Sequence, residues 1–217
     1  MFALHGSDLD DLRELPFRER LRAAGAERLQ LNLDDTDVAD APLRFGPGTP
    51  ISGVVSVWTD GPVDAVVDVV RAAAPDADGW RVEEREPLPP PGVPDGARAD
   101  ALANIAFLRR PTSMSPEDWL DDWLERHTSV AIETQGTFGY VQNPVVEALT
   151  PEAPEVAGIV EELFSMAAMT DTHAFYGSGG DQAELDRRFS RLMDSVARFG
   201  ADKGLDLVPT SRYLWTL

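Results

Sequence analysis

The predicted order of strands and helices is the same in the two halves of this 217-residue chain. Apolar patterns and helix-start signals predict a strand, a helix, two strands, a helix and a strand in residues 1–86, and again in residues 100–217. This is the order of a ferredoxin-like βαββαβ unit. The sequence therefore predicts an α+β protein of two tandem ferredoxin-like repeats with antiparallel sheets. Such an arrangement offers pockets between the paired sheets.

The first repeat contains alternating strands and two informative prolines. Ser7 and Asp10 form a helix-start pattern, and Pro16 predicts a break in the following helix, because an interior proline removes a backbone hydrogen bond. Pro62 predicts the start of the second helix. The predicted strands of this repeat are residues 1–5, 28–33, 53–58 and 80–86.

A proline-rich segment separates the two repeats. Residues 87–94 read Pro-Leu-Pro-Pro-Pro-Gly-Val-Pro. Prolines at this density favour an extended, semi-rigid spacer. We therefore expect an N-terminal unit in residues 1–86, a linker in residues 87–99 and a C-terminal unit in residues 100–217.

The second repeat begins its first helix at Ser115 and Pro116, with the serine as the cap and the proline in the first turn. Its second helix is expected over residues 182–199. The predicted strands are residues 101–108, 136–143, 158–164 and 207–215. Both third strands begin with a glycine, Gly53 and Gly158, which supports duplication although the two halves share little sequence identity.

The composition argues against several classes of function. The chain has 38 acidic and 19 basic residues, a formal net charge of -19, and such a surface repels phosphate backbones and anionic lipids. It has no cysteine for a disulfide or a thiolate site. No apolar run approaches the roughly 18 residues of a membrane span, and the first residues lack a signal-peptide pattern. We expect a soluble, cytoplasmic protein that binds neither nucleic acid nor membrane.

One helix combines aromatic residues with a histidine. Trp119, Trp123 and His127 recur at a spacing of four and so share one helical face. His127 is expected near the carbonyl end of this helix, where the dipole favours imidazolium and would keep the ring titrating near neutral pH. Such a histidine suits general acid–base catalysis. The alternative is a histidine that caps the helix end beside two core tryptophans.

The second half resembles the EthD family, named for ethyl tert-butyl ether degradation. The resemblance lies in residues 114–119, in the Trp-x-x-x-His pattern of residues 123–127 and in the Tyr-x-Gln-Asn pattern of residues 139–143. Glu161 and Phe164 match a later strand with a glutamate followed by an aromatic residue. The resemblance covers about residues 100–217, and the first half looks like a diverged copy without these signatures.

The resemblance implies a fold and a range of activities. It implies sheets packed face to face as a pseudo-dimeric α/β barrel, closed by one chain or by a homodimer, with a pocket inside the barrel or between a sheet and its helices. It further implies an enzyme without a metal or organic cofactor, performing dehydration, decarboxylation or cyclisation on an apolar aromatic or polyketide-like substrate. The alternatives are an oxygenase of the same barrel group and a non-catalytic ligand-binding protein.

The candidate site residues come from these patterns. Tyr140 and Gln142 alternate on one strand face and could line a pocket with Phe138, although the tyrosine could equally be core. Glu161 and Glu162 face opposite sides of their strand, and whichever points inward is a candidate base or the partner of an arginine. The candidate catalytic residues are His127, Tyr140 and Glu161, and the candidate substrate-binding residues are Trp119, Trp123, Phe138, Gln142, Asn143, Phe164 and His173.

Several further signals have plainer interpretations. Asn143 precedes a proline and also reads as a strand end. Asp171 could orient the ring of His173, yet a loop histidine beside an acid is usually solvated. Leu163 stands where the family often places tryptophan, so an aromatic contact at that position is not expected. The three histidines show no metal-ligand spacing, and we expect no metal site.

Overall fold

The computed structural model describes residues 1–6 and 9–217, so the helix start predicted at Ser7 lies outside the described residues. The first half contains the strands β1 (Phe2–Leu4), β2 (Ala26–Leu33), β3 (Gly53–Thr59) and β4 (Asp78–Val82), and the helices α1 (Leu15–Ala23) and α2 (Val63–Ala73). The second half contains the strands β6 (Leu102–Leu108), β7 (Gly139–Ala148), β8 (Gly158–Phe164) and β9 (Asp206–Thr216). Its helices are α3 (Pro116–Leu120), α4 (Thr128–Thr134), α5 (Thr172–Tyr176) and α6 (Gln182–Arg198).

The hydrogen-bonded strand order confirms the tandem repeat. The first half is ordered β4-β1-β3-β2 and the second half β9-β6-β8-β7, so each places its own fourth, first, third and second strand side by side. The seams β2–β9 and β4–β7 join the two sheets, and all of these pairings are antiparallel. The result is a closed eight-stranded α/β barrel, and an α/β barrel is what the family resemblance implies.

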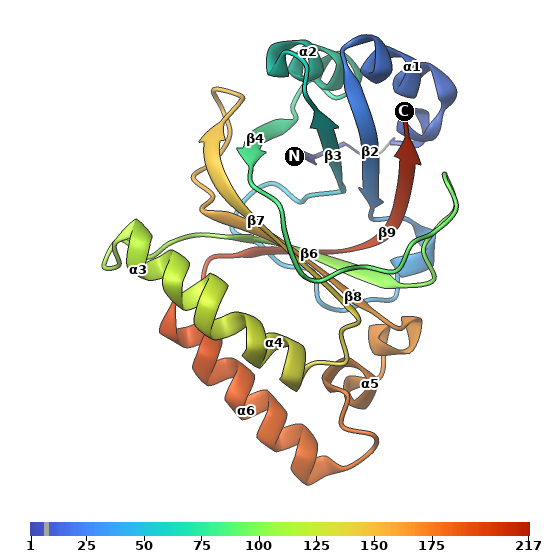
Figure 1. The fold of residues 1–217 in the computed structure, drawn as a ribbon. Coiled ribbons are helices and arrows are strands. Elements are labelled where there is room, and N and C mark those ends of the chain that lie inside the picture. Colours follow the sequence, from blue (N-terminus) through green and yellow to red (C-terminus); the bar gives the residue numbers. More distant parts are fainter. Residues whose placement is uncertain (7–8) are drawn as a thin grey trace.

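The helices cover the outside of this barrel. Figure 1 shows α1 and α2 on one side and α3, α4 and α6 on the opposite side, with the strands between them. Strand β9 belongs to both sheets, because residues 206–210 pair with β6 whereas residues 211–216 pair with β2. One chain therefore closes a barrel whose two halves are continuous through β9.

The proline-rich segment differs from its prediction. The strand expected at residues 80–86 ends at Val82, and a separate strand β5 (Arg85–Leu88) pairs with β7. A proline is tolerated there because β5 is an edge strand. Further along, the amides of Gly96 and Ala99 donate to the carbonyls of Leu214 and Arg212 on β9. The segment is thus hydrogen-bonded to the barrel, and its role as a domain boundary stays a prediction.

Strand β2 shows how the sequence separates the outside of the barrel from its inside. Leu29, Leu31 and Leu33 are fully or nearly buried in the cluster that includes the helix residues Phe17 and Leu21. The residues that alternate with these leucines are polar, and by the pleat of a strand they point into the barrel. Among the described residues, no helix is long and apolar enough to cross a membrane.

Candidate functional site

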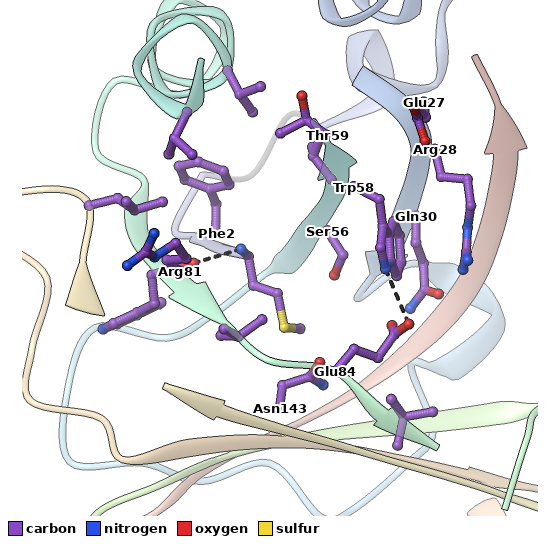
Figure 2. Close-up of a pocket in the computed structure, with 18 of the residues that line it drawn as sticks. Phe2, Glu27, Arg28, Gln30, Ser56, Trp58, Thr59, Arg81, Glu84 and Asn143 are labelled. Carbon is purple, nitrogen blue, oxygen red and sulfur yellow. Dashed lines mark hydrogen bonds between the residues drawn. The ribbon is translucent and has the colours of Figure 1, made fainter. Parts of the chain in front are cut away.

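A pocket of about 440 Å³ opens inside the barrel, and side chains from both sheets line it (Figure 2). Its inner wall consists mainly of buried polar side chains, and its mouth carries an aromatic ring with several charged groups. The inner residues include Gln30, Ser56, Val141, Asn143, Glu161 and Arg212. The mouth includes Arg28, Trp58, Thr59, Arg81, Glu84 and Glu86.

A buried ion pair forms the floor of the pocket. Glu161 on β8 and Arg212 on β9 are 3% and 5% exposed, and Arg212 Nε lies 3.3 Å from Glu161 Oε1. Gln30 Nε2 donates to both oxygens of Glu161 at 3.1 Å, and Asn32 Nδ2 donates to Oε1 at 2.8 Å. These contacts satisfy the carboxylate as an anion, because every neighbour is a donor or a cation.

The network continues across the barrel and extends beyond the pocket. Asn32 Nδ2 also donates to Thr210 Oγ1 at 3.1 Å, and that hydroxyl donates to the backbone carbonyl of Ala103 at 2.7 Å. Side chains of β2, β8 and β9 are therefore fixed relative to one another. A rigid polar floor of this kind can position a ligand without rearranging.

Two inner polar atoms have no hydrogen-bond partner among the described residues, the Ser56 hydroxyl and Arg212 Nε, which makes only the ion-pair contact with Glu161. Among the described residues, the hydroxyl of Ser56 is buried and has no hydrogen-bond partner, although the side chain lines the pocket. A buried hydroxyl without a partner costs about 1–3 kcal/mol. The Asn143 amide lies on the same pocket, contributed by β7 (Figure 2). The Ser56 hydroxyl and the Asn143 amide are placed to bind a polar atom of a ligand.

The mouth of the pocket combines a flat ring with a carboxyl group. Trp58 Nε1 donates to Glu84 Oε1 at 3.2 Å, drawn as a dashed line in Figure 2. The Arg28 guanidinium lies 4.1 Å from the centroid of the Trp58 ring, in cation–π contact. Partial burial raises the pKa of the Glu84 carboxyl, and the hydrogen bond from Trp58 opposes this only in part. A carboxylate with a raised pKa is a better proton acceptor at neutral pH.

His127 lies elsewhere, between the second sheet and its helices. Its Nδ1 is 3.0 Å from the Ser195 hydroxyl, and its ring centroid is 4.8 Å from that of Phe199. The predicted helix end is wrong, because a π-helical segment (Asp121–His127) continues directly into α4. Burial lowers the pKa of His127 to about 4, so the expected dipole-stabilised imidazolium is wrong too. The linings of the main cavities among the described residues do not include His127.

The other residues of the resemblance pack in the same layer. Trp119 and Trp123 are 1% and 0% exposed, with ring centroids 5.1 Å apart. Tyr140 is buried in their cluster, and Gln142 Oε1 accepts from Thr128 Oγ1 at 3.2 Å. The expectation that Tyr140 and Gln142 line a pocket is wrong for the barrel cavity, because their strand neighbours Val141 and Asn143 face it instead.

The adjacent residues Glu161 and Glu162 lie in different environments, one in the barrel and one in the helix–sheet layer. Glu161 faces the barrel, whereas Glu162 faces the helices, where Gln135 donates to it and Tyr140 lies opposite it across the strands. Burial raises the pKa of Glu162 to about 7. Of the residues proposed from sequence, the structure thus brings only Glu161 and Asn143 to the barrel pocket. The roles of all of them stay predictions.

Three further candidates lie outside the pocket. Phe138 packs on the cluster that contains Leu163. Phe164 stacks on Phe175 with centroids 4.4 Å apart. His173 lies on α5, where Asp171 caps its backbone amide, and its Nδ1 is 2.7 Å from the Ser178 hydroxyl. Asp171 therefore contacts the backbone and not the ring of His173, and this histidine is a half-buried helix residue instead of the solvated loop residue that the sequence favours.

Sequence reasoning missed the contribution of the first half to the site. Arg28, Gln30 and Asn32 alternate with leucines along β2, and this polar face was a usable signal. A strand whose apolar face is covered by helices must turn its polar face into the barrel. Among the described residues, no group of three or more His, Cys, Asp or Glu side chains could hold a metal ion. The expectation of chemistry without a cofactor stays a prediction.

The chain resembles two solved structures over nearly its whole length. One is a proposed monooxygenase from Lactobacillus acidophilus NCFM, 11% identical, with 99% of this chain and 93% of that chain covered and a TM-score of 0.48. The other is an anthrone oxidase-like protein, 9% identical, with 99% and 91% covered and a TM-score of 0.53.

The chain shares its fold with the anthrone oxidase-like protein. At 9% identity the likeness concerns the fold alone. No protein-family model and no curated protein sequence matches this chain, so the EthD resemblance stays a prediction.

The ion pair gives a stability prediction. In Glu161→Gln, Arg212 keeps a buried charge without a carboxylate partner, so unfolding free energy should fall by about 3–5 kcal/mol. Adding Arg212→Met removes that charge and should recover most of the loss. Urea unfolding monitored by circular dichroism measures both variants. A Glu161→Gln variant as stable as the wild-type chain would show that the Arg212 charge does not need Glu161 as its partner.

The helix–sheet layer gives a pH prediction. Because the folded pKa of Glu162 is about 7 against about 4.5 when unfolded, its neutral form stabilises the fold and that stability is lost as pH rises through this window. His127 acts oppositely, because its folded pKa of about 4 means stability is lost as pH falls below about 6.5. Glu162→Gln should therefore stabilise the chain at pH 8 by on the order of 1–3 kcal/mol and change little at pH 4.5.

Urea unfolding at the two pH values tests this directly. The exposed Glu155→Gln is the matched control and should show no comparable difference between pH 8 and pH 4.5. Equal effects of Glu162→Gln at both pH values would contradict the buried carboxyl. In the Glu162→Gln variant, the net loss of stability on acidification should also be steeper than in the wild-type chain, because the gain from protonating Glu162 no longer offsets the loss from protonating His127.

Proposed function

We propose that this chain oxidises an aromatic molecule that carries a ring-bound oxygen atom with dioxygen inside the barrel pocket, with Glu84 as the base. The observation that carries the proposal is the pairing of the Trp58 ring with the Glu84 carboxyl at the mouth, above a buried Ser56 hydroxyl without a partner among the described residues. A flat ring, a proton acceptor and a free polar anchor match the parts of such a substrate.

The chemistry needs a substrate that becomes electron-rich when it loses a proton. In an anthrone-type molecule, the base removes one proton from the ring CH₂ group, and the resulting carbanion adds to dioxygen to give a hydroperoxide. Loss of water then leaves a carbonyl at that carbon. One oxygen atom stays in the product, the other leaves as water, and the substrate carbon supplies the electrons.

The other groups have supporting roles in this proposal. The aromatic substrate would lie against Trp58, and Ser56 or Asn143 would bind its oxygen atom. The Arg28 guanidinium beside Trp58 would stabilise the substrate anion electrostatically. Glu161 is a poor base candidate, because Gln30, Asn32 and Arg212 already occupy its oxygens. We assign it the role of holding the floor of the pocket.

This proposal follows the oxygenase alternative of the sequence analysis. The acid–base reading centred on His127 has less support, because its ring contacts Ser195 and Phe199 within the helix–sheet layer. The likeness to an anthrone oxidase-like protein supports the choice of test substrate. We also propose that the substrate is a small molecule and that the chain is related to the EthD family.

Oxygen consumption with anthrone tests the proposal. The wild-type chain should consume dioxygen faster than anthrone does in buffer alone, and Glu84→Gln should lower kcat by about 100-fold or more. Because the pKa of Glu84 is raised, kcat/KM should rise with pH as its carboxyl ionises. An oxygen electrode and product absorbance measure both quantities.

Glu83→Gln is the matched control, since its exposed side chain is adjacent in sequence and does not line the pocket. It should retain the wild-type rate. Equal rates for Glu84→Gln and Glu83→Gln would remove Glu84 as the base. Saturable binding of anthrone without oxygen uptake would instead identify a ligand-binding protein.

A further inference from the structure

The barrel contains a second cavity at its other end, of about 300 Å³. The course of two strands shows that the two cavities lie apart. Strand β1 begins at Phe2 beside the first pocket and leads to His5 in the second, whereas β4 begins at Asp78 in the second and leads towards Val82 in the first. The two cavities thus lie at opposite ends of the same strands.

Trp80 lines both cavities. Its side chain is 2% exposed and belongs to the apolar cluster inside the barrel with Ile105, Ile159 and Val208. Its ring centroid lies 5.6 Å from that of Phe107. Its Nε1 donates to the carbonyl of Pro154 at 3.2 Å, which fixes the orientation of the ring. Trp80 is therefore a fixed wall between two spaces.

The second cavity suits an apolar group. Its ionisable side chains are paired with one another, His5 Nε2 with Asp78 Oδ2 at 3.0 Å and Arg109 with Asp206 Oδ2 at 2.6 Å. The remaining wall is largely apolar, from Ala3, Ile51, Phe107, Pro154 and Val156. Because these ionisable groups are already paired, a hydrocarbon chain could enter this space without lying against an unpaired charge.

We propose that Trp80 sets the length of the substrate by separating the polar pocket from this apolar cavity. The inference rests on the proposed function only in taking the first pocket as the site of the aromatic head. The substrate class is then an aromatic molecule with a short apolar side chain, which ends at the Trp80 ring. Removing the ring joins the cavities and admits longer chains.

Binding of 4-n-alkylphenols, from propyl to octyl, tests the length limit by isothermal titration calorimetry. Affinity for the wild-type chain should rise by about fourfold per methylene until the alkyl group reaches Trp80, and then stop rising. In Trp80→Ala the rise should continue, so that octylphenol binds at least about 10-fold tighter than it does to the wild-type chain.

Phe107→Leu is the matched control, because Phe107 lines only the second of these two cavities. It enlarges that cavity but keeps the wall, and its length limit should equal that of the wild-type chain. A folded Trp80→Ala with the wild-type limit overturns the proposal. If Trp80→Ala fails to fold, Trp80→Leu is measured in its place with the same criterion.

A crystal of the wild-type chain under xenon pressure tests the wall without any variant, since xenon enters apolar cavities. Separate xenon positions on the two sides of the Trp80 ring support the proposal. A continuous row of xenon atoms past the ring overturns it. Neither binding experiment depends on turnover, so failure of the oxidation assay and failure of the wall are distinguishable.

Discussion

The buried ion pair between Glu161 and Arg212 organises the polar end of the barrel. A charged pair inside a barrel loses its hydration, and it persists only where further donors satisfy the remaining oxygen lone pairs. Gln30 and Asn32 supply those donors from the other half of the chain. The network therefore links side chains of β2, β8 and β9 across one of the two seams, and it gives the barrel a polar interior at one end.

That polarity determines where a ligand can bind. Apolar side chains such as Trp80 and Phe107 fill the middle of the barrel, whereas the region around the ion pair remains open as a pocket. The Ser56 hydroxyl projects into this space, and the Trp58 ring with Glu84 stands at its mouth. The helix–sheet layer around His127 is instead closely packed with aromatic rings. The fold thus places His127, the histidine that the sequence suggests for acid–base catalysis, outside the barrel pocket.

The order of elements predicted the fold because each repeat carries its own complete pattern of strands and helices. The site could be predicted only in part, because strand alternation groups Tyr140 with Gln142 and Val141 with Asn143 without telling which pair faces the barrel. Both faces of β7 are buried there, so polarity gives no direction. On β2 the leucines mark the helix side, and the polar face could have been assigned. The predicted helix end at His127 is wrong because no proline or glycine stops the helix there.

The central claim is that ligands bind inside the barrel, on the floor built by Glu161 and Arg212. A crystal structure of the wild-type chain soaked anaerobically with anthrone tests it most directly. The account predicts density for the aromatic rings inside the barrel, between Trp58 and Asn143. Density between β7 and the helices beside His127, with the barrel pocket free of ligand, would contradict it.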